Sequence, residues 1–458
     1  MVSPYSSIAE LSKALRGKRI SSVELTEIYH SRLKTLGKEH RAVAELTEEL
    51  AMGQAKAADA RIAKGRRIGP LDGIPYGAKD LLSAKGIPTR WGSPGHHDQV
   101  FDYDATVVAK LAKVGAVLAA KLSMIEIAGG GNYNWAHASI DGACLCAWDK
   151  TRWAGGSSSG SGAAASLGLV GFTLGSETSG SITCPSAFNG VTGFRPTYGR
   201  VSRHGAMALC WTLDKIGPIC RSAEDAKTVL EAVSGYDGND PSTLRERLSF
   251  RGGRKKLRIG LLPEEFTKNK AGACEEAYGD TVAAFKKLGH EIVDVKYPDL
   301  PYGLAIGIIV DAEGSSAHEH FIRGPRLKEL TDVNQVAGLA AGLEVRAADY
   351  LWAMRFRTEA LKANSIWEQC DCIFTPVFYH AAPLIDQPFD KSFALMGGDS
   401  GPANLLGWPS MAFPIGFEEG APLGGQIIAP PFDEATCLAV TQDFQMSTDW
   451  HLRRPTEA

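Results

Sequence analysis

The sequence predicts a protein of the layered α/β class. Short unbroken apolar runs, such as residues 116–120 and 170–174, alternate with helix-like stretches, such as residues 104–114. Apolar runs of this kind are typical of strands that helices bury on both faces. The chain has 458 residues, of which 44% are hydrophobic, so it can bury a large core. A disordered or fibrous chain is therefore excluded.

The N-terminal part is predicted to be helical. Two capping boxes, Ser7 with Glu10 and Ser21 with Glu24, each precede apolar residues at helical spacing. We expect residues 1–70 to form an N-terminal helical segment that packs on the outside of the sheet.

The main domain is predicted to span residues 71–450. Its core, residues 71–235, ends with a helix at residues 222–233. Residues 236–256 are polar and rich in glycine and contain the basic run 251–256, so we interpret them as a solvated connector and a soft boundary. Beyond it the predicted elements are a strand at residues 257–262, a long helix at 345–368, and strands at 372–376, 411–415 and 426–429.

Charge and cysteine content exclude several classes of protein. The 49 Lys and Arg residues nearly balance the 52 Asp and Glu residues, so we expect no nucleic-acid partner. The nine cysteines are scattered without the C-x2-C spacing of zinc or redox sites, so we expect free thiols and no metal. The first ten residues lack the basic region followed by an apolar region that is typical of a secretory leader, and no apolar stretch approaches about 18 residues. We therefore expect a cytoplasmic protein without a membrane partner.

Residues 153–165 form a run of Gly, Ser and Ala. A flexible linker is disfavoured, because the run continues into a helical pattern and then a buried strand. A dinucleotide fingerprint and a nucleophile elbow centred on Ser158 both need a strand directly before the motif. Residues 151–154 are not a convincing strand, and the absence of a following Gly-Lys-Ser or Gly-Lys-Thr excludes a P-loop.

A second Ser/Gly cluster, residues 175–185, follows the apolar run that ends at Leu174. A strand that leads into a glycine-rich turn presents successive backbone N–H groups outward. Such groups can hold an anionic intermediate beside a hydroxyl nucleophile. Ser181 occupies the place of this nucleophile.

A serine nucleophile needs a base. None of the 11 histidines lies in a segment with motif character, although a histidine triad stays possible because triads assemble in space. Lys79 has better local support, because residues 71–80 are mostly small and apolar and a desolvated lysine loses its proton readily. Lys121 also follows an apolar run, so this signal alone is weak.

Together the three segments resemble those of the amidase signature family, whose members use a serine, a second serine preceded by a cis peptide bond, and a lysine. Ser157 and Ser181 are 24 positions apart, as the family pattern leads one to expect. The resemblance covers nearly the whole chain. The matching segments are residues 72–80 for the lysine strand, 155–160 for the glycine-serine segment, and 175–185 with 193–202 for the nucleophile loop.

The resemblance implies an α/β/α sandwich, in which helices cover both faces of a large mixed β-sheet. It implies that Ser181 attacks the acyl carbon and that Ser157, after a cis peptide bond, relays the proton to a neutral Lys79. Asp80 would point to the opposite face of the strand. The implied oxyanion donors are backbone N–H groups of Ser181 and of the three residues before it: Thr178, Ser179 and Gly180. No cofactor is implied.

The stretch of residues 129–135 should border the substrate carbonyl, so Gly130, Gly131 and Tyr133 are candidate substrate contacts. Aromatic candidates for the pocket favour an uncharged acyl or aryl group. They are Tyr133, Trp135, Phe378, Tyr379 and Trp408.

Residues that bind glutamine in one branch of the family are only partly matched. The A subunits of glutamine-dependent tRNA amidotransferases carry an aspartate for the glutamine amino group where this chain has Gly397, with Asp399 nearby. Arg357 matches an arginine that binds the glutamine carboxylate there, but plain amidases also have it. Glu177 replaces a common aspartate of the nucleophile loop.

We therefore expect a freestanding hydrolase that cleaves the carbon–nitrogen bond of amides, including aryl amides or carbamates (urethanes), through an acyl-enzyme. Its expected partner is a small-molecule amide or carbamate, and its expected state is a monomer or homodimer. The alternative is the A subunit of a glutamine-dependent tRNA amidotransferase complex, which supplies ammonia. A catalytically dead scaffold of the same fold is a third possibility.

Overall fold

The computed structural model describes residues 2–246, 248–250, 256–269, 272–389 and 400–456. These residues form one 11-stranded sheet with the strand order β1-β3-β2-β4-β6-β5-β10-β11-β9-β7-β8. The strands are β1 (Val43–Leu46), β2 (Pro75–Lys79), β3 (Val117–Leu122), β4 (Phe172–Glu177), β5 (Thr192–Arg195), β6 (Lys215–Cys220), β7 (Arg258–Leu261), β8 (Glu291–Asp294), β9 (Cys372–Pro376), β10 (Ser410–Glu418) and β11 (Ala421–Ile428).

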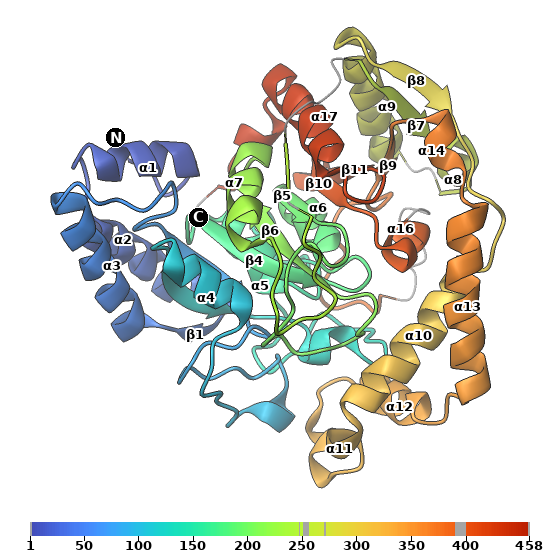
Figure 1. The fold of residues 1–458 in the computed structure, drawn as a ribbon, viewed down its shortest axis with the longest axis horizontal. Helices are drawn as coiled ribbons and strands as arrows, with labels where there is room; N and C mark the ends of the chain where they lie inside the picture. Colours follow the sequence, from blue (N-terminus) through green and yellow to red (C-terminus); the bar gives the residue numbers. More distant parts are fainter. Residues whose placement is uncertain (1, 247, 251–255, 270–271, 390–399, 457–458) are drawn as a thin grey trace.

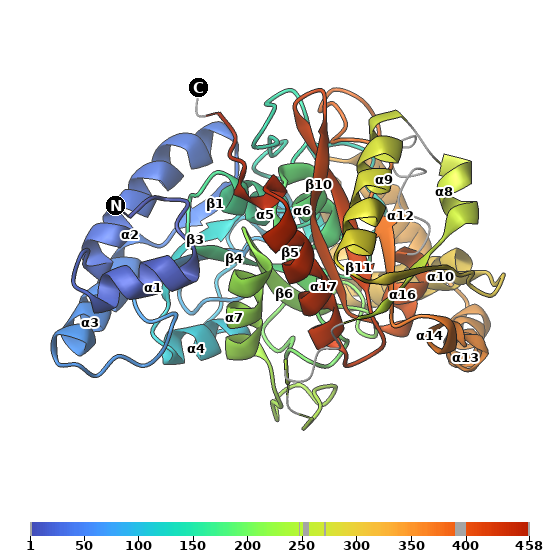
Figure 2. The same ribbon diagram turned by 90° about the horizontal axis from the view of Figure 1, so that it is seen from above.

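The sheet is mixed, which confirms the expected architecture. Strand β2 runs parallel to both β3 and β4, whereas β4 and β6, and β10 and β11, are antiparallel pairs. Helices α7 (Ala223–Val233), α9 (Gly272–Lys287) and α17 (Glu434–Ser447) cover one face, and α5 (Ser159–Ser166) and α6 (Thr183–Asn189) cover the other (Figures 1 and 2). The β4 strand is buried along its whole length, as its apolar run predicts.

Further helices lie outside these two layers. Near the N-terminus, α1 and α2 begin at the two predicted capping boxes, which are both formed. Helix α10 packs against both α12 and α13 at the far end of the molecule (Figure 1). The remaining bounds are α1 (Ile8–Arg16), α2 (Ser22–Arg32), α3 (Glu48–Ala63), α4 (Thr106–Lys113), α8 (Pro263–Asn269), α10 (Tyr302–Ala317), α11 (Glu319–Ile322), α12 (Val333–Gly342), α13 (Ala347–Ala363), α14 (Ile366–Gln369) and α16 (Ser400–Leu406).

The structure differs from the predicted elements in two places. Strand β1 lies inside the segment that was expected to be helical, and it pairs antiparallel with β3 at the sheet edge. Four residues are too few for a strand periodicity to be recognised. The long helix expected at residues 345–368 is divided into α13 and α14, because the backbone of Asn364 is extended. Most of the basic run 251–256 lies outside the described residues.

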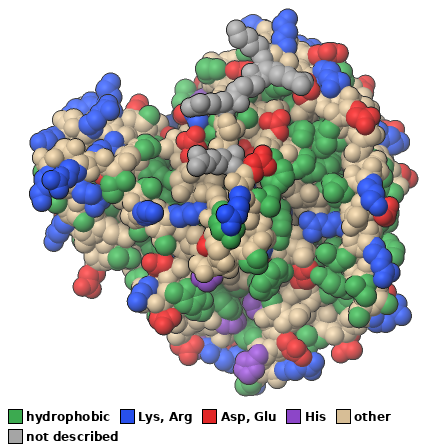
Figure 3. Space-filling view, in the orientation of Figure 1, with side chains coloured by type: hydrophobic (Ala, Val, Ile, Leu, Met, Phe, Trp, Pro, Cys, Tyr) green, Lys and Arg blue, Asp and Glu red, His purple; other side chains and the backbone are tan. Residues whose placement is uncertain are grey.

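No helix in the described part of the chain is long and apolar enough to cross a membrane. On the face shown in Figure 3, Lys and Arg side chains gather over the N-terminal helices, whereas both signs of charge are mixed elsewhere. The exposed cations on and directly after α1 are Lys13, Arg16, Lys18 and Arg19.

Candidate active site

Lys79 and Ser157 meet at the carboxyl end of β2. Because β2 and β4 are parallel neighbours, the loops that follow both strands lie at one edge of the sheet. Lys79 is fully buried, and its Nζ lies 2.7 Å from Ser157 Oγ and 3.0 Å from Ser176 Oγ. The structure thus joins the predicted lysine to the predicted second serine. It adds Ser176, which the sequence analysis did not single out.

The environment of Lys79 favours its neutral form. Burial lowers the pKa of this amine to about 7, against the opposing charges of Asp214 and Glu177. The neighbouring carboxylate in sequence, Asp80, instead forms an ion pair with Lys121, at 2.9 Å between Oδ1 and Nζ. Lys79 is therefore able to accept a proton near neutral pH.

The glycine-serine segment is fixed against β4. Its Gly156–Ser157 peptide bond is cis, as the resemblance implied. Ser158 Oγ donates to the carbonyl oxygen of Ser176 at 3.2 Å, and Ser161 Oγ donates to that of Leu174 at 2.9 Å. Ser158 is fully buried, which argues against the nucleophile elbow centred on it. The segment is the start of α5, not a linker.

The nucleophile loop is held by a buried carboxylate. Glu177 Oε2 accepts hydrogen bonds from the backbone N–H groups of Ile182 at 2.8 Å and Thr183 at 3.0 Å. Its other oxygen accepts a bond of 2.7 Å from Arg195. Burial alone would raise the pKa of Glu177, but the charges of Arg195 and Lys215 and these hydrogen bonds lower it to about 2. Glu177, which stands in place of the common aspartate, therefore fixes the nucleophile loop.

A cavity of about 310 Å³ opens beside this loop. Ser181 is 9% exposed and lines the cavity together with Gly156 and the three candidate oxyanion residues, Thr178, Ser179 and Gly180. Among the described residues no hydrogen bond is found between Ser181 Oγ and Ser157 Oγ, so contact between these two hydroxyls stays a prediction.

Of the candidate substrate contacts, Tyr133 lines the cavity and the two glycines do not. The carbonyl oxygen of Gly130 accepts a 3.0 Å hydrogen bond from Gln335 Nε2, and Gly131 lies against the backbone of α12. Phe378 also lines the cavity. Trp408 is instead a core residue beside Trp367, with ring centroids 4.8 Å apart. Trp135 and Tyr379 are likewise absent from the lining.

One wall of the cavity comes from α10, which the sequence analysis did not connect to the site. This helix contributes Ile306, Gly307, Val310 and Asp311 to the lining. Ala128, Leu209 and Cys184 complete the apolar part of the wall. No motif marks these residues, because their place depends on how α10 packs over the loops.

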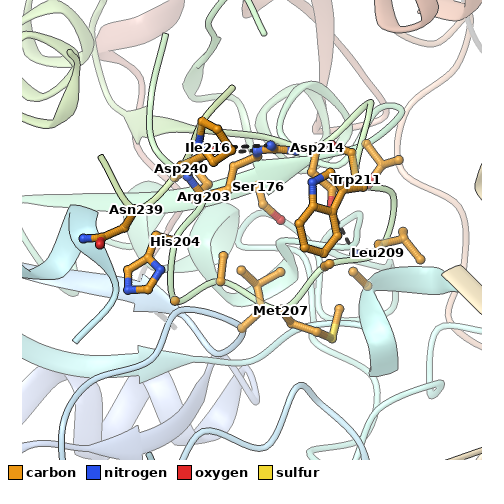
Figure 4. A pocket seen from close by; sticks show the side chains of 17 residues that line it. Ser176, Arg203, His204, Met207, Leu209, Trp211, Asp214, Ile216, Asn239 and Asp240 are labelled. Carbon is orange, nitrogen blue, oxygen red and sulfur yellow. Dashed lines mark hydrogen bonds and ion pairs between the residues drawn. The ribbon is translucent and has the colours of Figure 1, made fainter. Parts of the chain in front are cut away.

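A second cavity, of about 190 Å³, adjoins the first and shares Ala128, Thr178 and Leu209 with it. Figure 4 shows Ser176 directed into this cavity, with Asp214 and Trp211 beside it. Asp214 Oδ1 accepts a 2.6 Å hydrogen bond from Thr178 Oγ1. Burial raises the pKa of Asp214. The two cavities thus meet at Thr178, next to the hydrogen-bonded group of Lys79, Ser157 and Ser176.

Arg357, which the resemblance connects with a glutamine carboxylate, does not line the cavity at Ser181. Its Nη1 donates to the carbonyl oxygen of Thr212 at 3.1 Å. Gly397 and Asp399 lie outside the described residues. The lining, as far as the structure describes it, contains no histidine. Within the same part of the chain no cluster of three or more His, Cys, Asp or Glu side chains could hold a metal ion.

The sequence is similar to those of known proteins. A family model described as Amidase matches residues 24–438. The A subunit of a glutamyl-tRNA(Gln) amidotransferase from Coxiella burnetii is 35% identical, with 98% of each chain covered.

Two solved structures are also similar. The first, described as a vestigial protein complex that reveals the origins of an s-triazine catabolic enzyme, has a TM-score of 0.88 at 30% identity and covers 96% of this chain and 98% of that one. The native peptide amidase from Stenotrophomonas maltophilia has a TM-score of 0.83 at 27% identity, with 97% of each chain covered.

The relatives correct the expected partners. We expected a small-molecule amide or carbamate, no nucleic acid, and a monomer or homodimer. This expectation is wrong, because the relative from Coxiella burnetii is by name one subunit of an enzyme that acts on glutamyl-tRNA(Gln). A balanced total charge does not report how charge is distributed, and the basic residues near α1 are locally concentrated.

The lysine and second serine of the sequence motif meet in space, the sheet has the expected mixed topology, and the family match runs from residue 24 to residue 438. The chain therefore belongs to the amidase signature family, whose enzymes act on amide carbon–nitrogen bonds.

Proposed function

We propose that this chain cleaves an amide bond through an acyl-enzyme on Ser181. Neutral Lys79 takes a proton from Ser157, which takes one from Ser181 as Ser181 Oγ bonds to the acyl carbon. Lys79 then returns this proton through Ser157 to the leaving nitrogen, and the carbon–nitrogen bond breaks. Water attacks the ester, its proton follows the same relay, and the acid leaves with Ser181 restored.

The observation that carries this proposal is the buried contact between Lys79 and Ser157, with 2.7 Å between Nζ and Oγ and a lysine pKa of about 7. A base with a pKa near the working pH transfers protons most effectively. Thr178, Ser179 and Gly180 have backbone N–H groups and line the same cavity as Ser181. We assign them, with that of Ser181, to the developing oxyanion.

The cavity lining favours a largely apolar acyl or aryl part. Tyr133, Leu209, Ile306, Val310 and Phe378 surround the space next to Ser181. Aryl amides and carbamates fit this lining, since a carbamate presents the same carbonyl carbon and leaving nitrogen. Burial of an aryl ring there contributes about 25 cal/mol per Å² of apolar surface.

A second candidate function is that of an amidotransferase A subunit, which releases ammonia from glutamine within a complex. The observation in its favour is the 35% identity to the Coxiella burnetii protein over 98% of both chains. The names of the curated relatives favour this candidate over an aryl-amide hydrolase. The position of Arg357 outside the cavity lining favours the first candidate.

One assay separates the two candidates. The purified chain is given glutamine, aliphatic amides, anilides and aryl carbamates, alone and with the other subunits of a glutamyl-tRNA(Gln) amidotransferase. Turnover of an anilide by the chain alone supports the first candidate, and glutamine hydrolysis that appears only with those subunits supports the second.

The role of Ser181 is tested in parallel with a fluorophosphonate probe. The Ser181→Ala chain is expected to lose both turnover and labelling. The Ser31→Ala chain, changed at an exposed serine of α2, is expected to keep both. Labelling that persists without Ser181 would place the nucleophile elsewhere.

A further inference from the structure

One face of α10 forms a wall of the cavity beside Ser181. The lining residues Ile306, Gly307, Val310 and Asp311 recur at the spacing that places residues on one side of a helix. Three of these four residues are apolar or lack a side chain. Asp311 therefore brings a carboxyl group to a wall that is otherwise suited to hydrocarbon.

Asp311 is the charged residue of this lining, as far as the structure describes it. No hydrogen bond or ion pair to its carboxylate is found in the described part of the chain, and burial alone raises its pKa. It lies in the middle of α10, away from the helix N-terminus that would stabilise a negative charge. A partly desolvated carboxylate without a partner is costly in a folded protein, so a role toward a ligand is indicated.

We propose that Asp311 binds a positively charged group of the substrate, so that the preferred amides carry a protonated amine on the part held against α10. This inference rests on the proposed function and specifies its substrate class. A cationic group would supply the charge partner that the carboxylate lacks in the free chain. The surrounding apolar lining would strengthen this attraction, because it excludes water from the pair.

The same lining disfavours a negatively charged substrate. The described residues around the cavity include no lysine and no arginine. A substrate carboxylate would therefore meet Asp311 without a compensating cation, and like charges at a partly buried site repel. Amides that bear an amine are expected to bind most tightly, neutral isosteres less tightly, and amides that bear a carboxylate most weakly.

The test measures binding without turnover. Affinities are measured by calorimetry on the Ser181→Ala chain for three matched amides: para-(aminomethyl)benzamide, which is cationic at pH 7, para-ethylbenzamide, which is its neutral isostere, and para-(carboxymethyl)benzamide, which is anionic. We expect the cationic amide to bind about tenfold more tightly than the neutral one. The added Asp311→Asn change is expected to abolish this preference while the neutral amide still binds.

A matched control tests whether the effect on binding is specific to Asp311. The Glu319→Gln change removes an equal charge from an exposed side chain of α11, and the preference for the cationic amide should survive it. Equal binding of the cationic and neutral amides, a preference that persists in Asp311→Asn, or failure of all three to bind would each overturn the inference. Turnover of para-ethylbenzamide by the unmodified chain tests the proposed function separately, since that reaction does not depend on Asp311.

Discussion

Lys79 and Lys121 are both fully buried, on the neighbouring strands β2 and β3. Lys121 has a carboxylate partner, Asp80, at 2.9 Å, whereas Lys79 Nζ contacts two serine hydroxyls. Burial lowers the pKa of both amines, and the ion pair opposes this shift only at Lys121. The carboxylate partner therefore distinguishes Lys121, a structural lysine, from Lys79, the candidate base.

The first prediction concerns the pH dependence of activity. Lys79 accepts a proton only when it is neutral, and its pKa is lowered to about 7. We therefore expect kcat/KM to rise with pH up to about 7 and then to level off. The Lys79→Ala chain should lose roughly two to four orders of magnitude near neutral pH, and the rise should disappear.

Lys215 needs a control in this experiment, because burial lowers its pKa to about 7 as well. Its Nζ donates to the carbonyl oxygen of Thr178 and to Asn404 rather than to Ser157. The pH midpoint should therefore persist in Lys215→Met. A midpoint that persists in Lys79→Ala and disappears in Lys215→Met would show that the titrating group is Lys215 and not Lys79.

The second prediction contrasts the stability of two variants. Because the pKa of Lys79 is lower in the folded chain than in the unfolded chain, its contribution to stability rises with pH between about 7 and 10.5. Lys79→Met removes the cost of a buried cation, so it should raise the free energy of unfolding at pH 6 by a few kcal/mol and by less at pH 9. Lys121→Met should lower it by about 3 to 5 kcal/mol, because Asp80 is left buried without its partner.

Urea unfolding at pH 6 and pH 9 measures both changes. A Lys79→Met chain that is less stable than the unmodified chain at pH 6 would contradict the assigned cost of burial. The sequence indicated Lys79 weakly, through its small and apolar segment, and Ser157 only through the resemblance to the family, and the roles of both stay predictions. The sequence could not predict Asp311, because its role depends on which face of α10 meets loops that lie far away in the chain.

Helix α10 is an element whose surface shapes the cavity. An added Cβ at Gly307 meets nothing within 4 Å, so a side chain can begin there without a clash at a residue that lines the cavity. The third prediction is that Gly307→Leu lowers kcat/KM for bulky aryl amides by at least about tenfold while small aliphatic amides are less affected.

Gly303 provides the matched control on the same helix. An added Cβ there also meets nothing within 4 Å, but Gly303 is exposed and does not line the cavity. Gly303→Leu should therefore leave the substrate ratio unchanged. Both variants should keep or slightly gain stability, because glycine weakens a helix interior. Equal changes in the ratio for the two variants would show that α10 does not limit substrate size.

Local signals predicted some elements and not others. The capping boxes at Ser7 and Ser21 fix the starts of α1 and α2 through side chains that are close in sequence. Strand β1 depends instead on pairing with β3, which a four-residue segment cannot reveal by itself. The hairpin of β10 and β11 is longer than the strands expected there, since its pairing extends beyond the apolar runs.

One sheet joins strands from the N-terminal and the C-terminal parts of the chain. Strand β5 pairs with β6 on one side and with β10 on the other, where Phe194 is opposite Met411. Helix α6, which follows the nucleophile loop, packs closely on β11, because a Cβ added at Gly424 would lie 2.4 Å from that of Ala187. Sequence order does not disclose these long-range pairings, so the strand order could not be predicted from the residues alone.

The last prediction is that the two halves of this sheet cannot fold independently. A chain that ends after residue 235, the predicted end of the signature core, would keep β2, β4 and the serine loops but lose β10 and β11. Strand β5 would keep β6 but lose β10, and α6 would lose its contact with β11, so we expect this fragment not to fold. In the full chain, urea unfolding followed by hydrogen exchange in β4 and in β9 should show coincident midpoints. A folded fragment, or two separate transitions in the full chain, would show that the two halves of the sheet are independent units.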